Sequence, residues 1–227
     1  FGKGSLNAAK RGVGANISAV NAVMSGDFNN AFSAIRPPGH HAETEKAMGF
    51  CIFGNVAIAA KYAIENHKLK RVAVVDFDVH HGNGTQEILW DDPNVLFVST
   101  HQMPLWPGSG THEEHGNHQN ILNIPIQANT DGPAFRQKFD EIILPRLDSY
   151  KPEILIISAG FDAHYKDPLA NIELMTEDYE WITHRLCDIA DEHADGRLIS
   201  SLEGGYNLAA LAESVAVHVK VLMERSK

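Results

Sequence analysis

The sequence predicts an α/β protein with three layers, in which helices cover both faces of a mainly parallel central sheet. Apolar runs such as 72–76 and 154–159 lack the alternation of a half-exposed strand, so we interpret them as strands buried on both faces. Segments with helical periodicity lie between such runs, and no linker, repeat or low-complexity stretch interrupts the alternation. The 227 residues are therefore expected to form one domain.

In the first half of the chain, local signals place three helices and three strands. Ser5 can cap the first helix, which continues with apolar residues every three or four positions. Pro37 and Pro38 end the first strand because proline cannot donate to a sheet ladder. The predicted order is helix 5–26, strand 30–35, helix 52–66, strand 71–76, helix 84–90 and strand 95–100.

The second half opens with a long loop, from His101 to about His118, before the alternation resumes. A loop of this length inside a compact domain is usually functional or disordered. The next helix has an apolar face that includes Phe135 and Phe139, and the later one starting at Thr176 opens with a capping-box-like sequence. The predicted order is strand 120–125, helix 132–149, strand 154–159, helix 176–194, strand 197–202 and helix 208–224.

Composition excludes several classes of function. The formal charge of −10 argues against a nucleic-acid-binding surface, which needs clustered Lys and Arg. No stretch approaches the roughly 18 apolar residues of a membrane span, so we expect no membrane partner. The first residues lack the basic segment of a signal peptide, and Cys51 and Cys187 form no CxxC motif. These features predict a protein of the reducing cytoplasm.

Four clusters of polar residues follow predicted strands. They are His40 with His41, the segment 76–81, Asp162 with His164, and the segment 203–206. The carboxyl ends of parallel strands share one edge of a sheet, where open α/β proteins bind their ligands. The sequence therefore predicts that these clusters converge.

Asp78, His80 and Asp162 form a plausible set of metal ligands. Asp78 and His80 are two positions apart, so in an extended segment their side chains point the same way. Three protein ligands with an open position is the pattern of catalytic zinc. The simpler alternative is that Asp76 and Asp78 only cap the helix that begins near Gly84.

His40, His41 and Tyr206 are candidates for proton transfer and oxyanion binding. The ordinary pKa of histidine suits acid–base chemistry, and Asp76, expected to face away from Asp78, is free to pair with His40. Tyr206 follows two glycines that permit a turn, and its hydroxyl could donate to a developing oxyanion. Taken singly, the histidine pair is explained equally well by a polar loop, and Tyr206 after two glycines is more often part of an ordinary turn.

Together, four ordered motifs resemble the signatures of the histone deacetylase superfamily. They are RPPGHHA at 36–42, DFDVHHGNG at 76–84, SAGFDAH at 158–164 and LEGGY at 202–206. Their form is closest to the class II and bacterial branch, which includes acetoin-utilisation and acetylpolyamine deacetylases. The resemblance runs through essentially the whole chain.

This resemblance implies an arginase/deacetylase fold and a zinc-dependent amidohydrolase that removes acetyl groups from amines such as acetyl-lysine or acetylpolyamines. By position, the implied zinc ligands are Asp78, His80 and Asp162, and the implied catalytic residues are His40, His41, Asp76 and Tyr206. The implied substrate channel contains Gly49, Phe50 and Trp106. A structural K⁺ is implied at Asp76, Asp78, His80, Ser99 and Thr100.

Two departures from the family pattern affect these expectations. Asn83 stands where class I members carry an acid paired with the second histidine, so His41 is expected to be less basic. Relatives also carry further residues before the equivalent of Ser5. We therefore expect residues 1–227 to be one catalytic domain that is incomplete at its N-terminus, and a homo-oligomer stays open.

Three other functions are compatible with parts of the pattern. An arginase-like ureohydrolase would hold two manganese ions and need further bridging acids. Phosphoryl transfer with magnesium at Asp76 and Asp78 would need a phosphate-binding Gly-rich loop, which the sequence lacks. A non-catalytic interaction module of the same fold is the third alternative.

Overall fold

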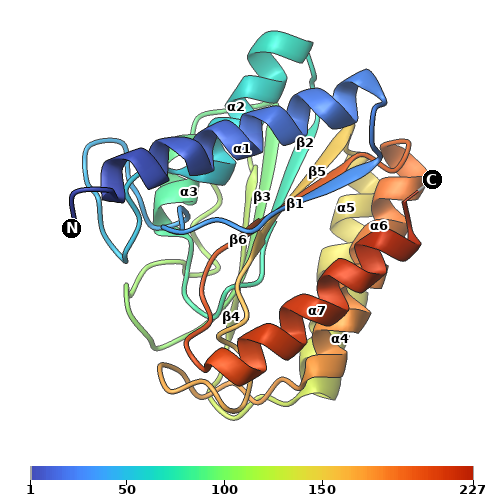
Figure 1. Cartoon of the computed structure of the whole chain (residues 1–227). Helices are drawn as coiled ribbons and strands as arrows, with labels where there is room; N and C mark the ends of the chain where they lie inside the picture. Colours follow the sequence, from blue (N-terminus) through green and yellow to red (C-terminus); the bar gives the residue numbers. More distant parts are fainter. Residues whose placement is uncertain (1, 227) are drawn as a thin grey trace.

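The computed structural model describes residues 2–226 as a three-layer α/β structure around one sheet of six parallel strands (Figure 1). The strands are β1 (Asn30–Ser33), β2 (Val72–Asp76), β3 (Val95–Gln102), β4 (Ile121–Ile126), β5 (Ile154–Ala159) and β6 (Leu198–Leu202), in the spatial order β1-β6-β5-β2-β3-β4. All five neighbouring pairs are parallel. The predicted fold class is confirmed.

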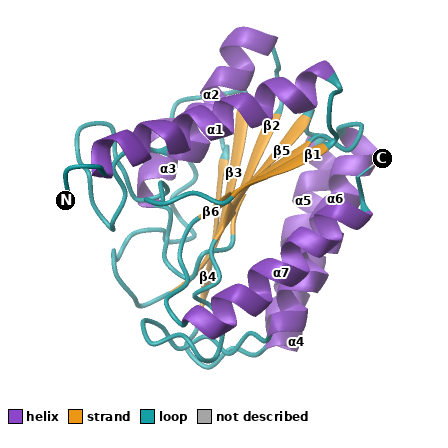
Figure 2. Ribbon diagram, viewed as in Figure 1, coloured by secondary structure: helices purple, strands orange, loops and turns teal. Residues whose placement is uncertain are grey.

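Helices cover both faces of the sheet, as Figure 2 shows. They are α1 (Ser5–Ser25), α2 (Asn55–His67), α3 (Asn83–Leu89), α4 (Gly132–Lys138), α5 (Leu144–Tyr150), α6 (Thr176–His193) and α7 (Leu208–Glu224). Val72 and Val74 of β2 pack in the cluster formed with α1, α2 and α3, whereas Ala73 and Val75 pack in the cluster formed with α4 to α7. This alternation explains why β2 is apolar on both faces.

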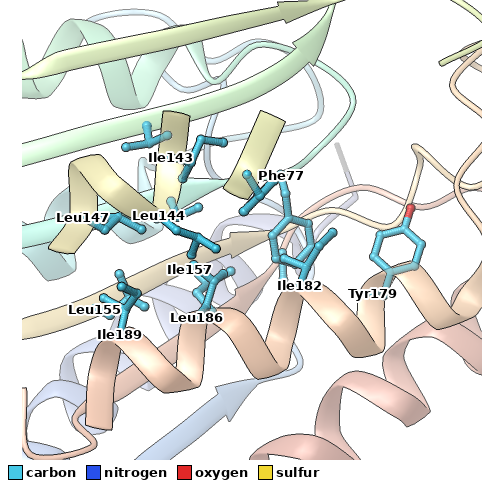
Figure 3. Close-up of a cluster of buried hydrophobic side chains, with 14 of the residues drawn as sticks. Phe77, Ile143, Leu144, Leu147, Leu155, Ile157, Tyr179, Ile182, Leu186 and Ile189 are labelled. Carbon is cyan, nitrogen blue, oxygen red and sulfur yellow. The ribbon is translucent and has the colours of Figure 1, made fainter. Parts of the chain in front are cut away.

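The cluster formed with α4 to α7 is the larger one and holds these helices against the sheet (Figure 3). Ile182, Leu186 and Ile189 of α6 recur with helical spacing and contact a layer formed by Leu155 and Ile157 of β5. All are buried, and full burial of one such aliphatic side chain stabilises a fold by about 1.5–3 kcal/mol. The strand β5 that this packing holds pairs in parallel register with β2, and both strands lead into the polar clusters.

Most predicted boundaries lie within three residues of the observed ones, with two informative differences. Strand β3 continues two residues further, to Gln102, and pairs with β4 as far as Ile126. The predicted helix 132–149 contains a π-helical segment, Phe139–Ile143, between α4 and α5. Pro145 follows this segment and has no N–H for the carbonyl of Glu141, which favours a wider turn there.

In the order of the sheet, the end of β2 lies where the chain switches from one half of the sheet to the other. From β2 the chain moves outward through β3 and β4 and then returns to β5, on the other side of β2. Asp76 pairs in register with Ser99 of β3 and Ser158 of β5. A crevice at such a switch is the usual ligand site of open α/β sheets.

Across residues 2–226, none of the helices combines the length and the apolar character needed to traverse a bilayer. This agrees with the absence of a long apolar run in the sequence.

His218 of α7 is a buried histidine that the structure holds in a neutral form. The Thr183 hydroxyl donates to the carbonyl of Tyr179, so Nδ1–H of His218 donates to the Thr183 hydroxyl oxygen and the Ser200 hydroxyl donates to Nε2. Burial lowers the pKa of His218 to about 3. Both ring nitrogens are thus satisfied without a charge.

Because the unfolded chain protonates this histidine near pH 6.5 and the folded chain only near pH 3, its contribution to stability is complete above pH 6.5 and is lost as the pH falls toward 3. We expect His218→Gln to reduce the acid-side slope of the free energy of unfolding by up to roughly 1.4 kcal/mol per pH unit. Urea denaturation at several pH values measures this slope. His112→Gln, at a side chain 76% exposed, should keep the wild-type slope, and equal slopes for His218→Gln and wild type would contradict the assignment.

Candidate active site

Three buried side chains at the carboxyl ends of β2 and β5 offer a compact set of metal ligands. One ligand atom from each of Asp78, His80 and Asp162 lies within 4.8 Å of the others. His80 Nδ1 is 3.2 Å from Asp78 Oδ1 and 3.1 Å from Asp162 Oδ2. The convergence predicted from sequence is present, although residues 78–80 form a bend rather than an extended strand.

Backbone groups hold the two carboxylates in place. Gly204 N donates to Asp78 Oδ2 at 2.8 Å, and Val79 N donates to Asp162 Oδ1 at 2.9 Å. A Cβ at Gly204 would come within 2.2 Å of Asp162 Oδ2, and one at Gly160 within 2.2 Å of Asp78 Oδ2. The glycines therefore let the backbone close around the acids.

The electrostatics of this group favour a cation. Burial and the charge of Asp78 raise the pKa of Asp162, while His40 and His80 overcome the burial of Asp78 and lower its pKa. Hydrogen bonds to Asp162 and Asp78 likewise outweigh burial and raise the pKa of His80. Two buried carboxylates thus compete for one imidazole, an arrangement that a divalent metal would neutralise. The residues fit a zinc site by ligand type and by separation.

His40 lies between two carboxylates rather than beside one. Its Nδ1 is 2.9 Å from Asp76 Oδ2, as the sequence predicted, and its Nε2 is 3.7 Å from Asp78 Oδ1. Asp76 was expected to face away from Asp78, yet both approach the same ring. Residues two apart in an extended strand share a face, so the observed arrangement is the one that the spacing favours. Burial lowers the pKa of His40, but Asp76 and Asp78 outweigh it and raise this pKa well above its ordinary value.

His41 has a neutral partner instead of an acid. Its Nδ1 is 2.8 Å from Asn83 Oδ1, and Asn83 Nδ2 donates to Glu43. Burial and the neighbouring charge of His40 lower the pKa of His41 to about 2. The two adjacent histidines, with ring centroids 3.9 Å apart, therefore favour opposite protonation states.

A cavity of about 280 Å³ opens above the proposed ligands. It is lined by His41, Gly49, Phe50, His80, Leu105, Trp106, Leu169 and Tyr206. Phe50 and Trp106 are 66% and 48% exposed and stand at its rim. All three predicted channel residues thus border the cavity that His80 and Tyr206 share.

The turn carrying Tyr206 is fixed from several sides. Gly205 has φ +132°, a conformation that favours glycine, and its carbonyl accepts from Arg36. The charges of Asp78 and Asp162 add to burial in raising the pKa of Tyr206, so its hydroxyl stays protonated and able to donate.

The residues expected around K⁺ lie together beneath the same site. Ser99 is the register partner of Asp76, and its hydroxyl is 3.0 Å from His101 Nδ1. The Thr100 hydroxyl donates to the carbonyl of Asp76 at 3.5 Å. This places oxygen atoms from two neighbouring strands around the Asp76–His80 segment.

Four further residues of the site were not assigned a role of their own from the sequence. Glu203 is fully buried and accepts from Gly39 N and His40 N, so it fixes the loop of the two histidines. Asp167 accepts from Tyr206 N, and Leu169 lines the cavity. The carboxylate of Glu114 accepts from Gly110 N and Thr111 N and anchors the long loop.

His164, grouped with Asp162 in the sequence, belongs to a different set of contacts. Its Nδ1 accepts from Lys166 N, and its ring stacks on Tyr165 with centroids 4.9 Å apart. It is therefore part of the loop after β5 and not of the proposed metal ligands.

Comparison with known proteins shows one consistent family. The sequence matches the histone deacetylase domain over residues 1–222. It is 47% identical, over 82% of its length and 42% of the relative, to the chloroplastic histone deacetylase 10 of rice, Oryza sativa subsp. japonica. It is 41% identical, over 92% of its length and 56% of the relative, to a histone deacetylase-like amidohydrolase of Pseudomonas aeruginosa.

The fold agrees with a solved member of this group. The crystal structure of the HDA15 HD domain superposes with a TM-score of 0.90 at 36% identity, covering 96% of this chain and 62% of that one. The chain spans about half the length of the two relatives above.

We expect zinc to stabilise the protein through Asp162. At free zinc 100-fold above its dissociation constant, stabilisation is about 2.7 kcal/mol, or a rise in melting temperature of roughly 5–10 °C. Asp162→Asn should abolish this rise without lowering the melting temperature of the metal-free protein, because it removes a buried carboxylate whose pKa is raised.

Thermal melts with and without zinc provide the measurement, and Asp148→Asn provides the control. Asp148, Glu192 and His193 form a second, partly exposed group of possible ligands. If Asp148→Asn abolishes the zinc-induced rise in melting temperature and Asp162→Asn keeps it, the second group, not the first, binds zinc.

Proposed function

Since the chain belongs to the histone deacetylase family, we propose that it is a zinc-dependent amidohydrolase that removes acetyl groups from N-acetylated amines. The observation that carries this proposal is the group of Asp78, His80 and Asp162, buried at the base of a cavity that Tyr206 and His41 also line. Zinc held there would polarise the acyl carbonyl and acidify a water. The names of the relatives support deacylation as the reaction.

The histidine pair and Tyr206 would divide the remaining chemistry. His41 is uncharged near neutral pH, so it is suited to take a proton from the attacking water. His40 is held protonated by Asp76, and a member of the pair returns a proton to the departing amine. The protonated Tyr206 hydroxyl would donate to the carbonyl oxygen as negative charge develops on it.

The cavity supports an acyl amine on an unbranched chain as substrate. Phe50 and Trp106 would enclose an aliphatic stem, with Gly49 leaving room beside His41, where a Cβ would approach His41 within 2.2 Å. Acetyl-lysine in a protein and an acetylated polyamine both present such a stem. We propose that K⁺ binds among Asp76, Asp78, His80, Ser99 and Thr100, where two strands supply oxygen atoms.

We further propose that residues 1–227 act as one catalytic domain, because both core clusters pack on a single sheet. Cytoplasmic location and the absence of a nucleic-acid partner stay predictions from composition. Two of the plant relatives are named as chloroplastic proteins.

The site favours deacylation over the other functions considered. An arginase-like centre needs acids bridging a second metal, but the only other group of possible ligands found within residues 2–226 lies on α5 and α6, near their C-terminal ends. A non-catalytic module would not require a partly buried Tyr206 and a histidine pair with opposed pKa values.

A panel of acetyl-lysine peptides and acetylpolyamines, assayed for zinc-dependent deacylation, tests the proposed function. Asp162→Ala serves as control, and equal activity in the control would overturn the mechanism. Activity on acetylpolyamines alone would assign the substrate to small amines.

In the same assay, Tyr206→Phe should lower kcat by about 100- to 1,000-fold, as expected when a donor to the oxyanion is removed. KM should change little, because this hydrogen bond forms fully only in the transition state. Near-normal kcat in Tyr206→Phe would exclude the assigned role.

A further inference from the structure

We propose that Asp167 is a positioning residue that holds Tyr206 in its working place; this rests on the proposed function. Asp167 belongs to the loop after β5 and is 7% exposed. Its Oδ2 accepts from Tyr206 N at 2.7 Å and from Asn207 N at 3.3 Å. One buried carboxylate thus binds the backbone of the tyrosine that would stabilise the oxyanion.

The same carboxylate also holds a second residue that lines the cavity. Its Oδ1 accepts from Leu169 N at 3.0 Å, and Leu169 lines the cavity together with Tyr206. A second contact joins the two segments, because Asn207 Nδ2 donates to the carbonyl of Lys166 at 3.2 Å. The loop 164–169 and the turn 204–207 are therefore tied together mainly through Asp167.

The turn needs these hydrogen bonds because its two glycines leave its backbone flexible. Gly204 and Gly205 precede Tyr206, and glycine restricts its backbone less than any other residue. Gly204 N is held by Asp78, but beyond Gly205 the amides of Tyr206 and Asn207 both depend on Asp167. Without this acceptor, the amides of Tyr206 and Asn207 would lose their hydrogen bonds, and the turn would be held only at Gly204 and Gly205 before Tyr206 and by the Asn207 side chain after it.

A carboxylate suits this place better than a neutral side chain. It accepts three backbone N–H groups on its two oxygens, which an amide with one oxygen cannot do. It also lies at the N-terminus of α7, a helix of 17 residues capped by Asn207, whose dipole stabilises a negative charge.

Steady-state kinetics of Asp167→Ala and Asp167→Asn, on an acetyl-lysine peptide with a fluorogenic leaving group, test this inference. Misplacing Tyr206 should lower kcat by about 10- to 100-fold in Asp167→Ala and leave KM within about twofold. Asp167→Asn should fall between Asp167→Ala and wild type, since an amide oxygen can keep part of the contacts. Asp140→Ala, at a side chain 52% exposed in a helical segment, is the matched control and should behave as wild type.

The decisive comparison repeats both substitutions in the Tyr206→Phe background. If Asp167 acts through Tyr206, its loss should change the residual kcat by less than about twofold there. If the Asp167 substitutions lower kcat by the same factor in both backgrounds, the proposal is overturned. Loss of the zinc-induced rise in melting temperature in the Asp167 variants would also overturn it.

Hydrogen–deuterium exchange separates this inference from the proposed function. The amides of Tyr206 and Asn207 should exchange faster in the segment 204–210 of either Asp167 variant, while β2 and β5 keep wild-type protection. Unchanged exchange in that segment would overturn the proposal. If the wild type deacetylates nothing in the panel, the proposed function fails, and this exchange result still decides whether Asp167 holds the turn. If Asp167→Ala does not fold, the same comparisons on Asp167→Asn decide it.

Discussion

The proposed site depends on one constraint, the close approach of two buried carboxylates to a single imidazole. Asp78 and Asp162 both reach His80 Nδ1, and like charges at this distance in a buried place are stable only beside a cation. Backbone amides of Gly204, Val79 and His80 secure the carboxylates, and Gly160 and Gly204 leave space for them. The structure around the group therefore preserves an arrangement that is unfavourable by itself and useful for holding a metal.

The charge of Asp78 extends this constraint to the histidine pair. Asp78 also lies 3.7 Å from His40 Nε2, so the pKa of His40 responds to Asp76 and Asp78 together. A protonated His40 then lowers the pKa of His41, whose own partner is the neutral Asn83. Opposed protonation states in two neighbouring groups are a common basis for assigning acid and base roles.

Fold class and the convergence of the four polar clusters could be predicted from sequence, because strand burial and strand ends are local signals. The apolar run of β2 and the motif that follows it were sufficient to place Asp78 and His80 at the sheet edge. The predicted direction of Asp76 was wrong, because residues two apart in a strand share a face, and Asp76 and Asp78 both reach His40. The roles of Asp167 and Glu203 could not be assigned from sequence, since each also holds backbone amides that lie far away in the sequence.

The pairing of β2 with β5 has a further consequence, for the order in which the protein assembles. Val72 aligns with Ile154, so Asp78 and Asp162 meet only when the intervening chain, which holds β3, β4, α4 and α5, has closed as a long loop. Contacts this distant in sequence form slowly because a long loop must close first. A complete set of ligands would therefore mark a late stage of folding, and metal uptake would follow the closing of the sheet.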